Sequence, residues 1–303
     1  MNVFFNLRYI VVICITLITI IVNLSFGQTD SLTPSKQSNK KVVLNASVIA
    51  GWAGSQSALY QIWYSDYNTG KFHVFDDSHE WLYMDKLGHI FTNYQLTKTL
   101  FHTYSTSYSE HSALIRSTAV SLGFQTTLEL MDGFSSGWGF SWTDMLANTM
   151  GASLFYLQHA KFKHQVIQPK FSFSPSHLAH YRPMLLGNST IQQVFKDYNG
   201  QTYWYSFKLP QQSIKRIPAW INLAFGYSIT NKLDAHLNNY HTSDGKTLTA
   251  RTEFLCALDI NLEKIPVKNR FLKGLFRAAN SIKFPFPTIG YSTGKLHFYP
   301  IYF

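Results

Sequence analysis

The hydrophobic pattern changes character along this chain, and the change limits which folds it can adopt. In the first half, apolar residues recur at helical spacing, predicting helices at about 42–64, 80–103, 110–131 and 141–160. In the second half, short aromatic and β-branched segments separated by polar turns predict strands at 202–209, 219–228, 251–262 and 291–303. Helices followed by strands favour an α+β fold, with an N-terminal core of three or four helices and a β-rich C-terminal half.

Two capping patterns mark where predicted helices begin. Asp77 is followed three residues later by Glu80, and Ser141 is followed three residues later by Asp144. In each case an apolar periodic run comes next, which is typical of a capping box at a helix N-terminus. We therefore expect one helix to start near Glu80 and another near Ser141.

The N-terminus has the three parts of a secretory signal. Arg8 precedes a mostly apolar run, and Ser25 and Gly27 place small residues around a cleavage site. The alternative is an uncleaved anchor, but the apolar run is short of the roughly 20 residues that a spanning helix needs. Cys14 follows the bulky Ile13, so no lipid attachment is expected there. We predict a signal peptide at residues 1–27 and export to the periplasm or outer membrane.

The predicted signal peptide sets the boundaries of the remaining chain. Residues 28–41 have almost no large apolar side chains and are expected to form a flexible linker. A helical domain is expected at 42–165 and a β-rich region at 166–303. After cleavage Cys256 is the only cysteine, so no disulfide within the chain is expected.

Composition favours a membrane surface over nucleic acid as a partner. Charged residues make up 14% of the chain, against about 25% in an ordinary soluble domain. Aromatic residues make up 16%, and the net charge is +10. Aromatic rings suit membrane interfaces, and positive charge suits anionic lipid. An aromatic-rich soluble domain is the alternative, and without a basic run or an RNA-binding signature we expect no nucleic-acid partner.

Each of three predicted helices carries a pair of polar residues on one face. The pairs are Asp85 with His89, Glu129 with Asp132, and Asp144 with Asn148. If these faces converge, an imidazole, carboxylates and an amide would form one candidate site, for a divalent metal or for acid–base chemistry. The alternative is structural, since such residues also cap helices and join them. No motif such as H-E-x-x-H is present, so no cofactor is assigned and a divalent metal stays open.

The segment 268–282 is a basic amphipathic stretch. Its apolar residues, including Phe271 and Leu275, form one helical stripe, and basic residues lie mostly elsewhere. Such a helix can lie on a membrane. The alternative, which we favour from sequence alone, is an ordinary surface helix that packs its apolar stripe on the sheet.

Three stretches carry a family resemblance: MDKLGHIFTNY (84–94), ELMDGFSSGWGFSW (129–142) and DMLANTMGA (144–152). With their surroundings, about residues 45–160, they resemble the YfiM-like predicted periplasmic lipoproteins, a domain of unknown function. The order D-K-x-x-H, E-x-x-D and D-x-x-x-N-x-x-G is also distantly similar to VanZ-like membrane proteins. The resemblance implies a periplasmic protein and no particular activity. The sequence departs from the lipoprotein pattern because it lacks a usable lipid-attachment site.

Three functions from different classes follow. The leading hypothesis is a non-catalytic envelope protein at the periplasmic face of the outer membrane, bound to the membrane surface or to outer-membrane components. The second is an envelope hydrolase that uses the His and carboxylate cluster on an anionic lipid or cell-wall substrate. The third is a scaffold that recruits a protein partner through the basic segment 268–282. The oligomeric state is not predicted.

Overall fold

The computed structural model describes residues 34–64, 69–210 and 217–303, and the predicted signal peptide lies outside these ranges. The chain divides into two compact units. The helical unit comprises Met1–Asp76 and Leu96–Tyr156, and the sheet unit comprises Asp77–Gln95 and Leu157–Phe303. The boundary falls inside two helices, so that each of them contributes residues to both units. The α+β class predicted from the sequence is confirmed.

The helical unit contains the long helices that hydrophobic periodicity predicts. They are α2 (Pro34–Trp63), α4 (Glu110–Phe134) and parts of α3 (Met84–Tyr104) and α5 (Trp142–Phe162). Helices α2 and α4 pack closely because Gly123 leaves room for the indole of Trp52. Of the helices in the described ranges, none has both the length and the apolar character that crossing a bilayer requires.

Helix α2 begins earlier than the sequence suggested. Residues 34–41 were expected to belong to a flexible linker, but they form the first turns of this helix. The side chains of Lys40 and Lys41 find partners inside the helical unit. The ammonium of Lys40 donates to the carbonyl oxygen of Thr106 at 3.0 Å, and that of Lys41 lies 5.2 Å from the centre of the Tyr108 ring.

The capping box predicted at Asp77 and Glu80 is wrong. The first ordered turn is a short 3-10 segment, Glu80–Tyr83, and α3 begins only at Met84. The carboxylate of Asp77 instead pairs with the ammonium of Lys86 at 2.7 Å, because a left-handed backbone at Trp81 (φ 49°) redirects the chain. The second predicted start is correct, since the Ser141 hydroxyl accepts from the backbone N–H of Asp144 at 3.0 Å.

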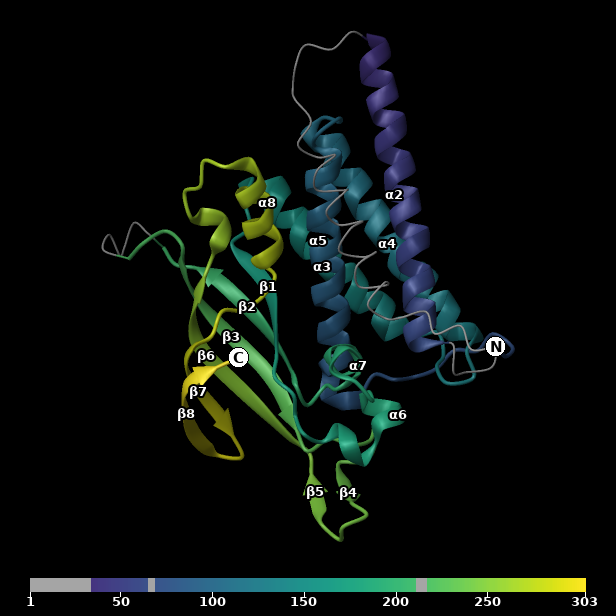
Figure 1. Ribbon diagram of the computed structural model, residues 1–303, viewed down its shortest axis with the longest axis vertical. Helices are drawn as coiled ribbons and strands as arrows, with labels where there is room; N and C mark the ends of the chain where they lie inside the picture. The colour runs from purple at the N-terminus through teal and green to yellow at the C-terminus, as the bar shows by residue number, and fades with distance from the viewer. Residues whose placement is uncertain (1–33, 65–68, 211–216) are drawn as a thin grey trace. The chain divides into compact units, whose positions relative to one another are not determined.

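Within the described residues, six strands of the sheet unit form one antiparallel sheet (Figure 1). Their order is β1 (Ile167–Phe173), β2 (Gln201–Lys208), β3 (Ile221–Thr230), β6 (Arg251–Ile260), β7 (Phe286–Ser292) and β8 (Lys295–Tyr302). A separate small hairpin pairs β4 (Asn239–His241) with β5 (Thr247–Thr249). The predicted strands near 202–209, 219–228 and 251–262 are confirmed, and the strand-like tail is a hairpin of β7 and β8.

The sheet curls, and the two ends of its strand order approach each other. The hydroxyl of Tyr302 in β8 lies 3.1 Å from that of Thr202 in β2, and its ring meets Trp204 edge-on at 5.8 Å. On the far side of β1, the backbone N–H of Phe171 donates to the carbonyl of Ser281. The curl gives the sheet an enclosed inner face and an outer face.

Part of the outer face is covered by the first half of α3. Phe91 contacts Phe171 of β1 and Tyr203 of β2, with ring centres 5.7 and 5.9 Å apart. Gly88 allows the close approach of the Tyr203 hydroxyl. Met84 and Leu233, both fully buried, complete this apolar core of the sheet unit. The helix therefore covers the sheet over β1 and β2.

Candidate functional site

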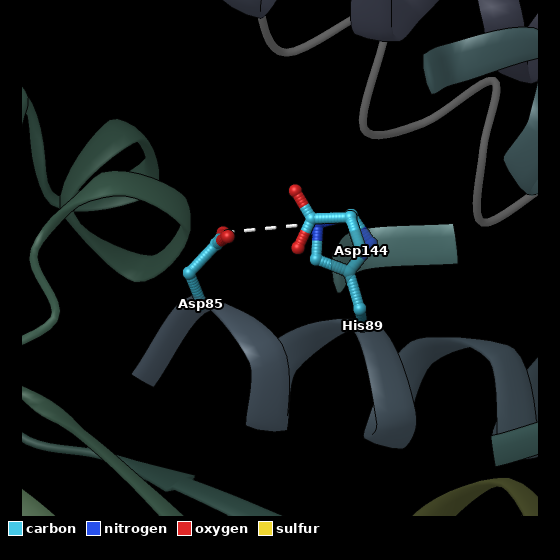
Figure 2. Close-up of side chains that lie close together, drawn as sticks. All are labelled: Asp85, His89 and Asp144. Atoms are coloured by element: carbon cyan, nitrogen blue, oxygen red, sulfur yellow. Dashed lines mark ion pairs between the residues drawn. The ribbon is translucent and has the colours of Figure 1, made fainter. Parts of the chain in front are cut away.

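Asp85 and His89 form an ion pair in the sheet unit, at the start of α3. They lie one helical turn apart, as their spacing predicted, with Asp85 Oδ1 3.7 Å from His89 Nε2. Figure 2 shows both side chains rising from the same helix, with the pair drawn as a dashed line. Each side chain is about one-fifth exposed, so a small ion or a water molecule has access to the pair.

The surroundings of Asp85 favour its charged form. Lys86 lies 3.0 Å from Oδ2, and the Tyr198 hydroxyl donates to Oδ1 at 2.7 Å. Burial alone would raise the pKa of this carboxyl, but His89, Lys86 and the Tyr198 hydrogen bond outweigh burial and lower the pKa to about 2. Asp85 is therefore a carboxylate at neutral and at mildly acidic pH.

Asp132 is held by a tyrosine in the helical unit. The hydroxyl of Tyr64 in α2 donates to Asp132 Oδ1 at 2.7 Å. Burial and the neighbouring carboxylates of Asp132 and Glu129 raise the pKa of Tyr64 above its usual value, so the hydroxyl keeps its proton. Tyr64 also lines a shallow hollow beside Leu130, Met131 and Phe134. The hydrogen bond between Tyr64 and Asp132 thus joins α2 to α4.

Asn148 belongs to a buried polar network that sequence reasoning did not find. Its side-chain carbonyl accepts from Gln125 Nε2 at 2.8 Å, and one turn away on α4 the Ser121 hydroxyl lies 2.6 Å from that of Thr97. The stripe on α4 consists of Ser117, Ser121, Gln125 and Glu129, all buried. Its i, i+4 spacing was a signal in the sequence, and polar residues on a buried helix face require partners from other helices.

The six predicted site residues thus fall in different places. The structure brings Asp85 and His89 together in the sheet unit. In the helical unit, Asp132 contacts Tyr64 and Asn148 contacts Gln125, while Glu129 and Asp144 are both buried. Asp144, the third side chain in Figure 2, comes from the first turn of α5. The convergence of all three pairs on one site stays a prediction.

The inner face of the sheet is buried and holds a polar group beside an apolar cluster of Trp204, Ala224, Leu255 and Ala257. Lys170 of β1 pairs with Asp259 of β6 at 2.7 Å, and neither side chain has any exposed surface. The Ser206 hydroxyl donates to the same carboxylate at 2.7 Å and accepts from Asn222 Nδ2 at 2.9 Å. A buried charge pair of this kind is stable only when its remaining hydrogen-bonding groups are also satisfied.

From β3 to β8, the outer face of the sheet is apolar and exposed. One cross-strand row consists of Phe225, Cys256, Ile289 and Phe298, and the next of Tyr227, Phe254, Tyr291 and Leu296. We call the exposed apolar side chains here the apolar face: Phe225, Phe254, Leu258, Ile289, Tyr291, Leu296, Phe298 and Ile301, each between 45% and 75% exposed. A patch of this kind marks a contact surface, because water-exposed sheets normally place such residues inside.

Residues 73–160 match the model of a family described as predicted periplasmic lipoprotein (DUF2279). The match supports an exported, periplasmic protein, and it contains all six predicted site residues. No curated protein and no solved structure matches the chain. The YfiM-like and VanZ-like resemblances, the signal peptide and the outer membrane stay predictions.

Proposed function

We propose that this protein attaches to the periplasmic face of the outer membrane through the apolar face of its sheet. The observation that carries the proposal is the exposure of the apolar face, with Phe298 and Ile301 outside while the charged pair of Lys170 and Asp259 is buried inside. Strands with apolar side chains outward and polar side chains inward suit an outer surface that meets lipid. Burying one such side chain in an apolar phase gains about 1.5–3 kcal/mol.

Vesicle flotation with the purified mature protein tests this function. The parent should float with vesicles of mixed phosphatidylcholine and phosphatidylglycerol. Phe298→Ser/Ile301→Ser should bind about ten-fold more weakly or worse, because two apolar side chains no longer enter lipid. The matched control is Met184→Ser/Leu237→Ser, which changes exposed apolar residues of the same unit outside the apolar face. A parent that stays in the aqueous fraction without detergent would contradict the proposal.

The second candidate is an envelope hydrolase, favoured by the charge-compensated Asp85–His89 pair inside the family-matched segment. His89 would be a metal ligand or general base, and Asp144 with Asn148 would position the other groups. Asp85 and His89 offer a carboxylate oxygen and an imidazole nitrogen, donors that suit a divalent ion such as Zn²⁺ or Mn²⁺. Glu129 and Asp132 would bind metal or orient water. The substrate class is an anionic lipid or cell-wall polymer.

Elemental analysis of the purified protein tests the second candidate. A near-stoichiometric metal in the parent, lost in folded Asp85→Ala and His89→Ala, is the expected result. His164→Ala is the matched control, since this ring contacts its neighbour Phe162 through the carbonyl and the side chain, outside the candidate site. Metal that survives both site substitutions would exclude Asp85 and His89 as ligands. With no metal in any sample, only the metal-free acid–base version would remain.

A further inference from the structure

Helix α8 (Arg270–Ala279) separates basic from apolar side chains around its axis. Arg270, Lys273 and Arg277 share one side, because they are three and four residues apart. Phe271, Leu272 and Leu275 occupy another side. Between residues 265 and 279 there are four basic residues, counting Lys268, and no acidic residue. The segment therefore carries positive charge that no residue within it neutralises.

Much of the apolar side of α8 is exposed. Phe271 is 58%, Leu272 36% and Leu275 51% exposed, whereas the one buried residue of the helix is Gly274. The interpretation favoured from sequence, an ordinary surface helix that packs its apolar stripe on the sheet, is therefore wrong for these three apolar side chains, while Phe276 and Ala279 of the same stripe are partly buried. Part of the basic side and part of the apolar side of α8 are left uncovered.

An asparagine side chain makes hydrogen bonds at each end of α8. At the N-terminus, Asn269 Oδ1 accepts from the backbone N–H of Leu272 at 3.1 Å. At the C-terminus, Asn280 Nδ2 donates to Gln168 of β1 at 2.6 Å and its Oδ1 accepts from Lys170 Nζ at 3.1 Å. The two Asn280 bonds tie the C-terminal end of the helix to the inner face of the sheet. Figure 1 shows α8 at one end of the strands that carry the apolar face.

We propose that α8 lies in the headgroup layer and binds anionic phospholipid, with Arg270 and Lys273 on the headgroups and Phe271 and Leu275 among the upper acyl chains. This inference rests on the membrane attachment proposed above and names the lipid class that it selects. An anionic surface complements both sides of the helix, since a basic amphipathic helix gains from headgroup charge and from apolar burial.

Vesicle composition separates this inference from the function on which it rests. The test measures binding of the mature protein to pure phosphatidylcholine vesicles and to vesicles with phosphatidylglycerol. Arg270→Gln/Lys273→Gln should bind the anionic vesicles about 20- to 30-fold more weakly than the parent, since each basic residue near such a surface contributes about five-fold. Binding to pure phosphatidylcholine should hardly change. The matched control, Lys71→Gln/Arg251→Gln, removes two exposed basic side chains elsewhere and should keep the preference.

Each outcome decides one of the two ideas. If the parent binds both vesicle types equally, or if the α8 variant keeps the parent's preference, α8 does not select anionic lipid and the sheet attachment stands alone. If the parent binds neither vesicle type, both the proposed membrane attachment and the proposed role of α8 are contradicted. If the control variant loses the preference as fully as the α8 variant, the selectivity comes from net charge and not from the helix.

Discussion

At the scale of single residues, the charges in this chain are explained by partners far away in sequence. Lys170 meets Asp259, and Asp85 meets Tyr198, whose hydroxyl binds it from 113 positions away. The Asp85–His89 pair could be predicted because both residues lie on one helix, where spacing fixes proximity. The Tyr198 and Asp259 contacts could not be predicted, because they depend on how strands and loops return to the same place.

Lys283 gives a pH-dependent prediction at this scale. Burial lowers its pKa to about 8, a shift that Lys170 reinforces and Asp259 opposes, while the unfolded lysine keeps its usual value. A lysine whose pKa is lower in the folded state binds fewer protons there, so stability rises with pH between the two values. We expect the free energy of unfolding to rise by about 1–2 kcal/mol from pH 8 to pH 9.5.

Denaturant unfolding at several pH values checks this expectation. The slope should be smaller in Lys283→Met, which removes the titrating amine, and unchanged in Lys264→Met, which changes an exposed lysine nearby. A parent whose stability is flat or falls over this interval would show that Lys283 is protonated in the folded protein like a surface lysine.

At the scale of elements, the long helices and the more apolar strands follow from local pattern. Strand β1 (Ile167–Phe173) was not predicted, because Pro169 and Lys170 interrupt its apolar character. A buried lysine is tolerated in this strand because Lys170 forms an ion pair with Asp259 inside the curled sheet. The start of α3 was misplaced for a related reason, since the left-handed turn at Trp81 is fixed by tertiary contacts with the sheet unit's core.

The β7–β8 hairpin gives a prediction about an element. Ser292 pairs with Lys295, so Thr293 and Gly294 form a two-residue turn with φ of 51° and 78°. Both angles suit a type I′ turn, in which Asn-Gly is preferred and a β-branched residue is strained. Thr293→Asn should stabilise the protein by about 0.5–1 kcal/mol, and Gly294→Ala should destabilise it by about 1–2 kcal/mol.

Thermal or denaturant unfolding of the two hairpin variants measures both effects. Space is not a factor at Gly294, because a Cβ there would have no neighbour within 4 Å. The destabilisation of Gly294→Ala would therefore report the backbone conformation alone. A variant as stable as the parent would contradict the left-handed turn.

At the scale of the whole molecule, both units bury a group of polar side chains and expose a group of apolar ones. In the helical unit, Ser121 and Gln125 are buried while Leu146 and Met150 are exposed. In the sheet unit, Asp259 is buried while Phe298 is exposed. The low fraction of charged residues and the high fraction of aromatic residues indicated from the sequence that apolar side chains would be exposed. The sequence could not show which surface is apolar, because that depends on strand register and on the curl of the sheet.

The most direct test of the central claim uses the protein's own Cys256, which lies within the outer rows of the sheet between Phe225 and Ile289. A fluorophore attached there, in a mature chain without Cys14, is bound to vesicles whose acyl chains carry bromine as a quencher. The control carries the label at Ser243→Cys, an exposed position of the β4–β5 hairpin, with Cys256→Ser. The account predicts strong quenching at Cys256 and little at residue 243. Equal or absent quenching at Cys256 on vesicle-bound protein would show that the apolar face does not meet lipid.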